Sequence, residues 1–253
     1  MLLKQDYRML PQAILFDLDD TLIHAYGGAE RAWLAVTLEL ADELAPLAPR
    51  EVAEAIGAFA RNFWADPERH RLWRVRLWDA RREIVAKSFA GLAKMGRPVP
   101  SAEVARRLAD RFSANRDEQM RLFPDAHNVV DALKARGMRL ALVTNGAAKD
   151  QRAKIERFDL TRRFDHIQIE GEHGFGKPDE RAYLHALCRL GVDAREAWMV
   201  GDNLEWEVVA PQRLGIFAIW FDSEGKGLPR DTHIMPDRVV ASLSELLQMA
   251  DSG

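Results

Sequence analysis

Hydrophobic and polar positions follow different patterns in two regions of the chain. Short apolar runs bounded by polar residues occur near the beginning and again after residue 120, and each is typical of a buried strand. These runs cover residues 13–16, 138–143, 166–169, 197–200 and 216–220. Residues 29–119, between the first run and the others, are almost continuously helical in pattern. The pattern therefore predicts a strand-rich region that is interrupted by a helical one.

Within residues 29–119, apolar residues recur every three or four positions, as they do on one face of an amphipathic helix. One such stripe consists of Ala32, Ala35, Val36 and Leu40, and another of Val52, Ala55, Ile56 and Phe59. Pro46 and Pro49 separate these helices, because proline is unfavourable inside a helix. Ser101, with Glu103 just inside, predicts the beginning of a later helix. We expect these helices to form one all-helical unit.

The strands and helices that alternate after residue 120 predict a fold of the α/β class with a doubly wound, parallel, Rossmann-like sheet. The first strand precedes the helical region, and the economical arrangement returns it to the sheet of the later strands. We therefore expect residues 1–24 and 120–253 to form a Rossmann-like core. Residues 25–119 would then be an inserted all-helical domain.

Composition is that of an ordinary globular protein, with 47% hydrophobic and 30% charged residues. The net charge of −3 gives no reason to expect a nucleic acid as partner. No window approaches the roughly 20 apolar residues of a membrane span, and residues 1–10 lack the apolar run of a signal peptide. The single cysteine, Cys188, fits a reducing cytoplasm, and its helical surroundings predict a small core residue. We expect a cytoplasmic protein.

Two acids, Asp17 and Asp19, stand where the first apolar run ends. Carboxylates are costly to place beside a hydrophobic core, so a pair at this spacing usually has a charged partner. A divalent cation together with a phosphoryl group would satisfy such a pair. A strand that simply ends in a solvated acidic turn is the alternative on this segment alone.

Further polar residues follow other strands of the predicted sheet. Thr144 and Asn145 come after the run 138–143, and Asp202 comes after the run at 197–200. The carboxyl ends of parallel strands are where open α/β sheets bind ligands. Singly, each of these residues is typical of a helix cap or turn, and Lys177 in its glycine-rich loop is typical of a surface turn. Together with Asp17 and Asp19, they predict one site with metal and phosphate ligands.

In this combination the chain resembles the haloacid dehalogenase superfamily, and specifically its phosphatases with a helical cap. Residues 142–227 look most like the branch that contains N-acylneuraminate 9-phosphatases and pyrimidine nucleotidases. The resemblance covers nearly the whole chain, because the helical region after the first motif is similar to the family's cap. The matching segments are Asp17-Leu18-Asp19-Asp20-Thr21-Leu22, Thr144-Asn145-Gly146, Lys177-Pro178 and Gly201-Asp202-Asn203.

The resemblance implies a role for each matching residue. Asp17 would be the nucleophile that forms an aspartyl-phosphate. Asp19 would protonate the leaving group and then deprotonate the attacking water. Thr144 and the backbone N–H of Asn145 would bind the phosphoryl group. Lys177 would neutralise charge on the nucleophile and on the phosphoryl oxygens.

The resemblance also implies a magnesium site. Asp17, Asp202 and the main-chain carbonyl of Asp19 would hold Mg²⁺, which prefers oxygen ligands. Glu207 stands five residues beyond Asp202, where the family usually has an aspartate. It is therefore a further candidate ligand, directly or through water, and Glu205 is a nearby alternative on a different helical face. Either glutamate could instead be a solvated helix acid.

The sequence thus predicts a Mg²⁺-dependent phosphatase that hydrolyses a small phosphorylated metabolite, such as a sugar phosphate or a nucleoside monophosphate. A phosphomutase shares these motifs and stays open, as does a catalytically inactive phosphate-binding protein. A 2-haloacid dehalogenase has no need for the acid Asp19. A phosphonatase needs a cap lysine, for which Lys87 and Lys94 are the candidates. The oligomeric state is left open.

Substrate choice is expected to lie with the helical region. His24 and Tyr26 follow the first motif at the hinge toward this region, so they are candidate substrate contacts or loop-ordering residues. The tryptophans of the region are expected mainly to pack between helices. They are Trp33, Trp64, Trp73 and Trp78.

Overall fold

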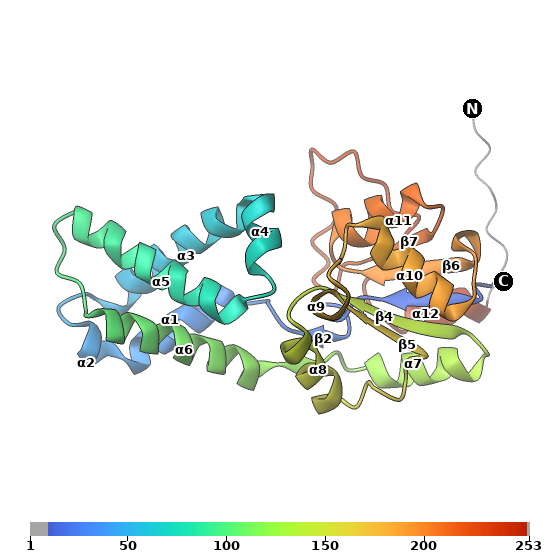
Figure 1. The fold of residues 1–253 in the computed structure, drawn as a ribbon, viewed down its shortest axis with the longest axis horizontal. Coiled ribbons are helices and arrows are strands. Elements are labelled where there is room, and N and C mark those ends of the chain that lie inside the picture. Colours follow the sequence, from blue (N-terminus) through green and yellow to red (C-terminus); the bar gives the residue numbers. More distant parts are fainter. Residues whose placement is uncertain (1–9, 252–253) are drawn as a thin grey trace. The chain divides into compact units, whose positions relative to one another are not determined.

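The computed structural model describes residues 10–251, and the chain divides into two compact units (Figure 1). The core unit consists of the described residues up to His24 together with those from Arg121 onward. The helical unit is Ala25–Met120. Residues 1–9, on which part of the signal-peptide prediction rests, lie outside the described residues.

A six-stranded sheet forms the centre of the core unit, with the order β5-β4-β1-β6-β7-β8. Every neighbouring pair is parallel. The predicted α/β class with a doubly wound parallel sheet is therefore confirmed. The strands are β1 (Ala13–Phe16), β4 (Arg139–Thr144), β5 (His166–Ile169), β6 (Ala197–Gly201), β7 (Phe217–Phe221) and β8 (Arg238–Val240).

Strand β1 lies in the middle of this sheet because all four of its residues are apolar and fully buried. Phe16 is in register with Leu142 of β4 on one side and with Val200 of β6 on the other. The carboxyl end of β1 is therefore flanked by the ends of β4 and β6. Polar residues that follow these three strands gather at one edge of the sheet.

Helices cover both faces of the sheet (Figure 1). On one face, α10 (Glu180–Leu190) packs against β1, β4 and β5 through a buried stripe, and Gly191 ends this helix with a φ of +64°. On the other face, α7 (Ala126–Ala135) packs against β4 and α12 (Glu245–Asp251). The other helical elements are α8 (Ala148–Arg157), α9 (Glu170–His173), α11 (Ala210–Arg213), a 3₁₀ turn η1 (Ala194–Glu196) and a π-helical turn η2 (Leu204–Val209).

The prediction for Cys188 is wrong, because its side chain is exposed on α10. The buried stripe of α10 includes Ala182, Tyr183, Ala186, Leu187 and Leu190. Cys188 directly follows Leu187, and one residue in a helix corresponds to a rotation of about 100°. The thiol is therefore turned off the buried face.

The helical unit is an all-helical bundle with its own hydrophobic core. Pro49 and Pro67 occupy the first turns of two helices, and the Ser101 side chain accepts a hydrogen bond from Val104 N at 3.3 Å, which confirms the predicted helix start. In the core, Trp33 stacks on another aromatic ring. The helices are α1 (Ala29–Glu39), α2 (Ala41–Leu44), α3 (Pro49–Ala65), α4 (Pro67–Trp73), α5 (Leu77–Lys94) and α6 (Ala102–Gln119).

The chain leaves and re-enters the core unit through two adjacent short strands. β2 (Ile23–His24) pairs in antiparallel fashion with β3 (Arg121–Leu122). This ladder brings the two ends of the insertion side by side within the core unit. Among residues 10–251, no helix combines the length and the apolar character that crossing a membrane requires.

Candidate active site

Asp17, the first residue after β1, has both carboxylate oxygens oriented by neighbouring donors. Lys177 Nζ donates to Oδ1 at 2.5 Å, and Thr21 Oγ1 donates to Oδ2 at 3.0 Å. The main-chain N–H of Asp17 donates to Val200 O at 2.9 Å, which continues the ladder between β1 and β6. The residue is only 6% exposed. Asp17 is therefore a fixed carboxylate at the carboxyl ends of the parallel strands.

Lys177 is fully buried, in contrast to a typical lysine in a surface turn. Its Nζ lies 2.5 Å from Asp17 Oδ1 and 2.6 Å from Glu207 Oε1. Burial by itself lowers the pKa of the ammonium, but the two carboxylates outweigh this effect and raise the pKa of Lys177 above its ordinary value. The side chain therefore stays charged at neutral pH.

The loop that carries Lys177 is held by Asn145, directly after β4. The Asn145 side chain donates from Nδ2 to Lys177 O at 2.7 Å and accepts from Lys177 N at Oδ1 at 2.8 Å. A Cβ on Gly176 would stand only 2.5 Å from Asn145 Oδ1, so glycine is needed for this close approach. The side chain of Asn145 thus fixes the main chain at Lys177, a role that was not predicted from the sequence.

Glu207 reaches the site from the π-helical turn η2. The Asn203 side chain caps this turn by accepting from Glu205 N and Trp206 N at 3.0 and 3.1 Å. Glu207 Oε2 accepts from Asn203 N at 2.9 Å, while its Oε1 faces Lys177. Glu207 is buried and Glu205 is exposed, so Glu207 is the acid that faces the site.

Close packing at Gly201 accommodates Glu207. A Cβ on Gly201 would overlap Glu207 Cγ and would stand 3.0 Å from Asp17 Cβ. Burial raises the pKa of Glu207 to about 7, although Lys177 opposes this shift. Glu207 Oε2 contacts Asn203 N and its Oε1 contacts Lys177 Nζ, so Glu207 supports the Lys177 ammonium; a metal contact of Glu207 stays a prediction.

Asp202, directly after β6, is where the negative charge of the site is least compensated. Burial raises the pKa of Asp202 to about 9, and the neighbouring Asp17, Glu207 and Asp20 raise it further. If the carboxyls of Asp17, Asp202 and Glu207 were all ionised, their three negative charges would exceed the single positive charge of Lys177, and this repulsion disfavours the ionised form of Asp202. A divalent cation with a preference for oxygen fits this donor set.

The side-chain donors for such a cation are few. In the part of the chain that the structure describes, no three His, Cys, Asp or Glu side chains form a group that could hold a metal ion. Asp17 and Asp202 could each supply a carboxylate oxygen, and a main-chain carbonyl could complete the set. The residues present therefore fit a Mg²⁺ ion that keeps several waters.

Asp19 is held by two residues of α8 that the sequence analysis missed. Lys154 Nζ lies 2.8 Å from Oδ1 and 2.9 Å from Oδ2 of Asp19. Gln151 Nε2 donates to Asp19 Oδ2 at 3.0 Å and to Thr144 Oγ1 at 2.5 Å. Thr144 is thereby linked to Asp19 through one amide.

A sequence signal for these residues exists in α8. The helix follows the Thr144 segment directly, and its buried positions include Gln151 and Lys154 beside Ile155. A helix whose inward face is polar must direct this face toward polar partners. Glu170 was also missed: its Oε2 accepts from Gly146 N at 3.0 Å and so supports the loop after β4.

The candidate substrate contacts His24 and Tyr26 belong to different units. The His24 ring stacks on Phe123, with 3.6 Å between ring centroids. Burial and the nearby Arg121 lower the pKa of His24. Tyr26 is 43% exposed in the helical unit. A role in substrate binding stays a prediction for both.

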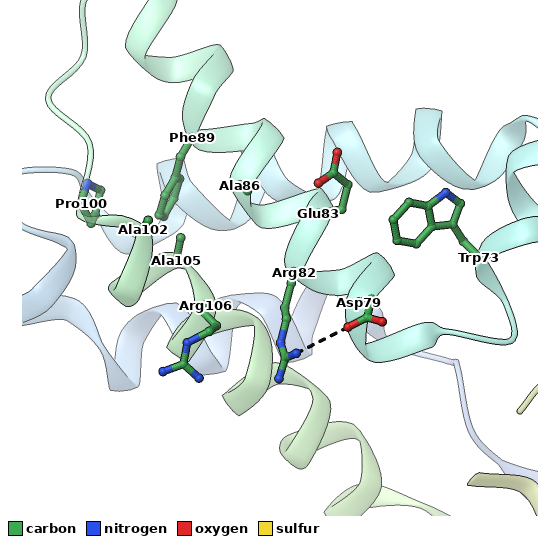
Figure 2. Close-up of a pocket in the computed structure, with 10 residues that line it drawn as sticks. All are labelled: Trp73, Asp79, Arg82, Glu83, Ala86, Phe89, Pro100, Ala102, Ala105 and Arg106. Atoms are coloured by element: carbon green, nitrogen blue, oxygen red, sulfur yellow. Dashed lines mark hydrogen bonds and ion pairs between the residues drawn. The ribbon is translucent and has the colours of Figure 1, made fainter. Parts of the chain in front are cut away.

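The helical unit contains a pocket of its own, with a volume of about 580 Å³ (Figure 2). Its arginines are already paired: Arg82 lies 2.6 Å and Arg106 3.1 Å from Asp110. None of the predicted site residues lines it. The pocket is lined by Trp73, Asp79, Arg82, Glu83, Ala86, Phe89, Pro100, Ala102, Ala105 and Arg106.

Comparison with known proteins agrees with this geometry. The family model of haloacid dehalogenase-like hydrolases matches residues 11–215. The chain is 37% identical to the phosphoserine phosphatase of Thermus thermophilus over 191 residues, which are 75% of this chain and 68% of that protein. It is 28% identical to the N-acylneuraminate-9-phosphatase of Rattus norvegicus over 245 residues, which are 95% and 94% of the two chains.

Among solved structures, the fold is similar to that of the magnesium-bound HAD hydrolase YfnB from Bacillus subtilis. The TM-score is 0.70 at 22% identity, over 96% of this chain and all of that one. The chain therefore belongs to the haloacid dehalogenase-like hydrolases. Within this family it is an enzyme of the phosphatase type, a hydrolase that acts on phosphate monoesters. The resemblance stated from the sequence motifs is confirmed.

Proposed function

We propose that this enzyme is a Mg²⁺-dependent phosphatase that hydrolyses a small phosphorylated metabolite through an aspartyl-phosphate on Asp17. In this proposal the core unit is the catalytic core and the helical unit is the cap. The observation that carries the proposal is the buried contact of 2.5 Å between the Asp17 carboxylate and the Lys177 ammonium. This contact fixes a nucleophile and, beside it, a positive charge for a phosphoryl group.

In the first step, an Asp17 oxygen attacks phosphorus and the bond from phosphorus to the ester oxygen breaks. Asp19 gives its proton to the departing oxygen. Lys177 and the Thr144 hydroxyl stabilise the charge on the phosphoryl oxygens, together with the backbone N–H of Asn145. Phosphoryl transfer depends mainly on positioning and charge stabilisation, so these few groups suffice.

In the second step, Asp19 takes a proton from a water molecule that attacks the aspartyl-phosphate. Phosphate leaves and Asp17 is regenerated as a carboxylate. Glu207 holds the Lys177 ammonium between two carboxylates, 2.6 Å from Glu207 Oε1. We therefore give Glu207 a supporting role at Lys177, and its contact with the metal ion, directly or through water, stays a prediction.

Asp17, Asp202 and the main-chain carbonyl of Asp19 would hold the Mg²⁺ ion. When bound, the ion neutralises the negative charge that the carboxylates and the phosphoryl group bring together. Support comes from the raised pKa of Asp202, since burial and the neighbouring carboxylates oppose its ionisation and a cation would favour it. These oxygen donors suit a hard cation.

The substrate proposed is a small phosphorylated metabolite, and a sugar phosphate or a nucleoside monophosphate is the class expected. The two relatives described above are named for different phosphorylated compounds, so family membership leaves the choice to residues outside the shared motifs. His24 and Tyr26 are the substrate contacts proposed, because they follow Asp17 and Asp19 closely in the chain. A cytoplasmic location stays a prediction.

Hydrolysis of p-nitrophenyl phosphate with and without Mg²⁺ tests the proposal. We expect turnover that depends on Mg²⁺, is removed by chelation and is lost in Asp17→Asn. Near-normal turnover in a purified Asp17→Asn sample would overturn the covalent mechanism. A panel of phosphorylated sugars, nucleoside monophosphates and phospho-acids then defines the substrate.

Two further assays separate the alternatives. Halide release from a 2-haloacid in the absence of phosphatase activity would favour a dehalogenase. Conversion of a sugar phosphate into its isomer without release of phosphate would favour a mutase. Absence of all three activities, with retained phosphate binding, would favour an inactive binding protein.

A further inference from the structure

Helix α8 turns two buried polar side chains toward the site. Gln151 is 2% exposed and Lys154 is 9% exposed, and a spacing of three residues places them on one face of the helix. Buried polar and charged groups are costly unless they are paired. The hydrogen-bond partners of Gln151 and Lys154 therefore indicate what role these two residues have.

The Gln151 amide connects two functional residues. Its Nε2 lies 2.5 Å from Thr144 Oγ1 and 3.0 Å from Asp19 Oδ2, so each of its two hydrogens has an acceptor. The opposite orientation of the amide would set Oε1 against the Asp19 carboxylate, with an acceptor facing an acceptor. The chemistry of the partners therefore fixes the orientation of the amide.

This contact has a consequence for Thr144. Because Thr144 Oγ1 accepts from Gln151, its own hydrogen must point elsewhere. The acceptor present is Asn145 O, at a long 3.4 Å. A phosphoryl oxygen at the site would be a better acceptor for this hydrogen.

Lys154 fixes Asp19 in a different way. Its Nζ contacts both carboxylate oxygens, at 2.8 and 2.9 Å, with about a tenth of each side chain exposed. Contact with both oxygens restrains the rotation of the carboxylate. Each of the two carboxylates therefore contacts a lysine: Asp19 contacts Lys154, and Asp17 contacts Lys177, which also pairs with Glu207.

We propose that Gln151 and Lys154 are positioning residues, which orient the Asp19 carboxylate for proton transfer and the Thr144 hydroxyl for the phosphoryl group. The inference rests on the proposed function. As the ionised carboxylate that Lys154 contacts, Asp19 takes a proton from water in the second step, and it delivers this proton to the ester oxygen in the first step of the next turnover. Both positioning residues act through Asp19 and Thr144, and we assign neither of them a contact with the phosphoryl group or the leaving oxygen.

The test compares two substrates that differ in their need for a proton. The leaving group of p-nitrophenyl phosphate departs without protonation, whereas that of phenyl phosphate is more basic and requires it. We expect Lys154→Met to lower kcat for phenyl phosphate by a factor of about 10² or more. With p-nitrophenyl phosphate we expect a rapid burst of about one p-nitrophenol per active site and then slow turnover, since hydrolysis of the intermediate needs Asp19 as base.

Two further variants and a matched control complete the test. Gln151→Leu keeps the side-chain volume and changes no charge, and we expect it to raise KM as well as to lower kcat for phenyl phosphate. It also serves if Lys154→Met does not fold. Lys154→Arg should restore part of the activity. Lys149→Met, at an exposed position of the same helix, should behave like the wild type.

The outcomes separate this inference from the proposed function. Equal losses with both substrates and no burst would overturn the positioning role, as would unchanged kinetics in Lys154→Met and Gln151→Leu. A wild-type enzyme that hydrolyses neither substrate would overturn the proposed function and this inference together. An active wild type, together with a Lys154→Met variant that releases a burst of p-nitrophenol but no comparable burst of phenol, supports both.

Discussion

An ion pair at the site of the core unit and an ion pair on the surface of the helical unit have similar distances but opposite surroundings. At the carboxyl edge of the sheet, Lys177 and Glu207 lie 2.6 Å apart with at most 1% of either side chain exposed. In the helical unit, Arg61 and Glu30 lie 2.8 Å apart with 65% and 80% exposed. Distance alone therefore does not indicate what an ion pair contributes.

The difference follows from the solvent around each pair. Water screens the exposed pairs of the helical unit, so each contributes about 0–1 kcal/mol. The buried groups of the core unit have lost their hydration, and each needs its partner to avoid a large penalty. The site of the core unit thus contains buried charged groups, whose burial costs free energy. These groups include the residues to which we assign catalytic roles.

The largest effect is expected for Lys177→Met, which removes the cation between Asp17 and Glu207. Leaving one partner of a buried pair uncompensated costs about 3–5 kcal/mol. We therefore expect the free energy of unfolding to fall by this amount and phosphatase activity to be lost. Urea unfolding and the p-nitrophenyl phosphate assay measure the two effects. A stable, active variant would show that the pair is not essential.

A smaller effect is expected for Gly201→Ala. The added Cβ would overlap Glu207 Cγ, and overpacking of this kind costs about 1–3 kcal/mol. Displacement of Glu207 should also reduce activity. Gly91 in α5 is the matched control, because a Cβ there meets nothing within 4 Å. Gly91→Ala should stabilise the helical unit by about 0.5–1 kcal/mol. Equal effects at the two glycines would contradict this comparison.

Asp165, directly before β5, forms an ion pair whose exposure lies between that of the buried and the fully exposed pairs. Its carboxylate accepts from Leu140 N at 2.9 Å and lies 2.9 Å from Lys134 Nζ, with 38% of the side chain exposed. Burial raises the pKa of Asp165, but the Leu140 N–H and Lys134 outweigh this and lower it overall. Asp165→Asn should therefore cost about 1 kcal/mol at pH 7.

The pH dependence of this cost follows from the lowered pKa. The carboxylate contributes its full stabilisation above the pKa of the unfolded chain, about 3.9, and loses it as the pH falls through the lower pKa of the folded state. Unfolding curves of wild type and Asp165→Asn should thus converge in acid. If the difference in unfolding free energy between wild type and Asp165→Asn stayed constant between pH 7 and pH 2, the stabilisation would not come from the ionised carboxylate.

The smallest effect is expected for Arg111→Gln in the helical unit. Arg111 lies 2.8 Å from Glu39 and 3.3 Å from Glu118, with 30% of its side chain exposed. We expect a change in unfolding free energy of less than about 1 kcal/mol, and a smaller one in high salt. A loss comparable to that of Lys177→Met would remove the contrast between the two units.

Many of the site residues at the carboxyl ends of the strands could be predicted, because the apolar pattern identifies the strands and parallel strands end on the same side of the sheet. The apolar run 13–16 identifies a central strand, and parallel strands present their carboxyl ends at one edge. Asp17 and Asp202 directly follow β1 and β6, and Thr144 is the last residue of β4. No knowledge of distant contacts was needed to gather them.

The contacts of the site could not be predicted in the same way. Lys154 and Gln151 lie in a segment rich in charged residues, which from sequence alone resembles a solvated helix. Their partner Asp19 is more than 130 positions away in the chain, so the pairing exists only in the tertiary structure. Strand β8 was missed because it has three residues, two of them exposed.

The lone thiol on α10 offers an experimental handle. Cys188 is exposed and is the single cysteine of the chain, so a maleimide dye would attach at one defined point of the core unit. A second cysteine introduced at Met95, which is 71% exposed in the helical unit, would accept a matching dye. Energy transfer between the two labels would then follow the separation of the two units during turnover.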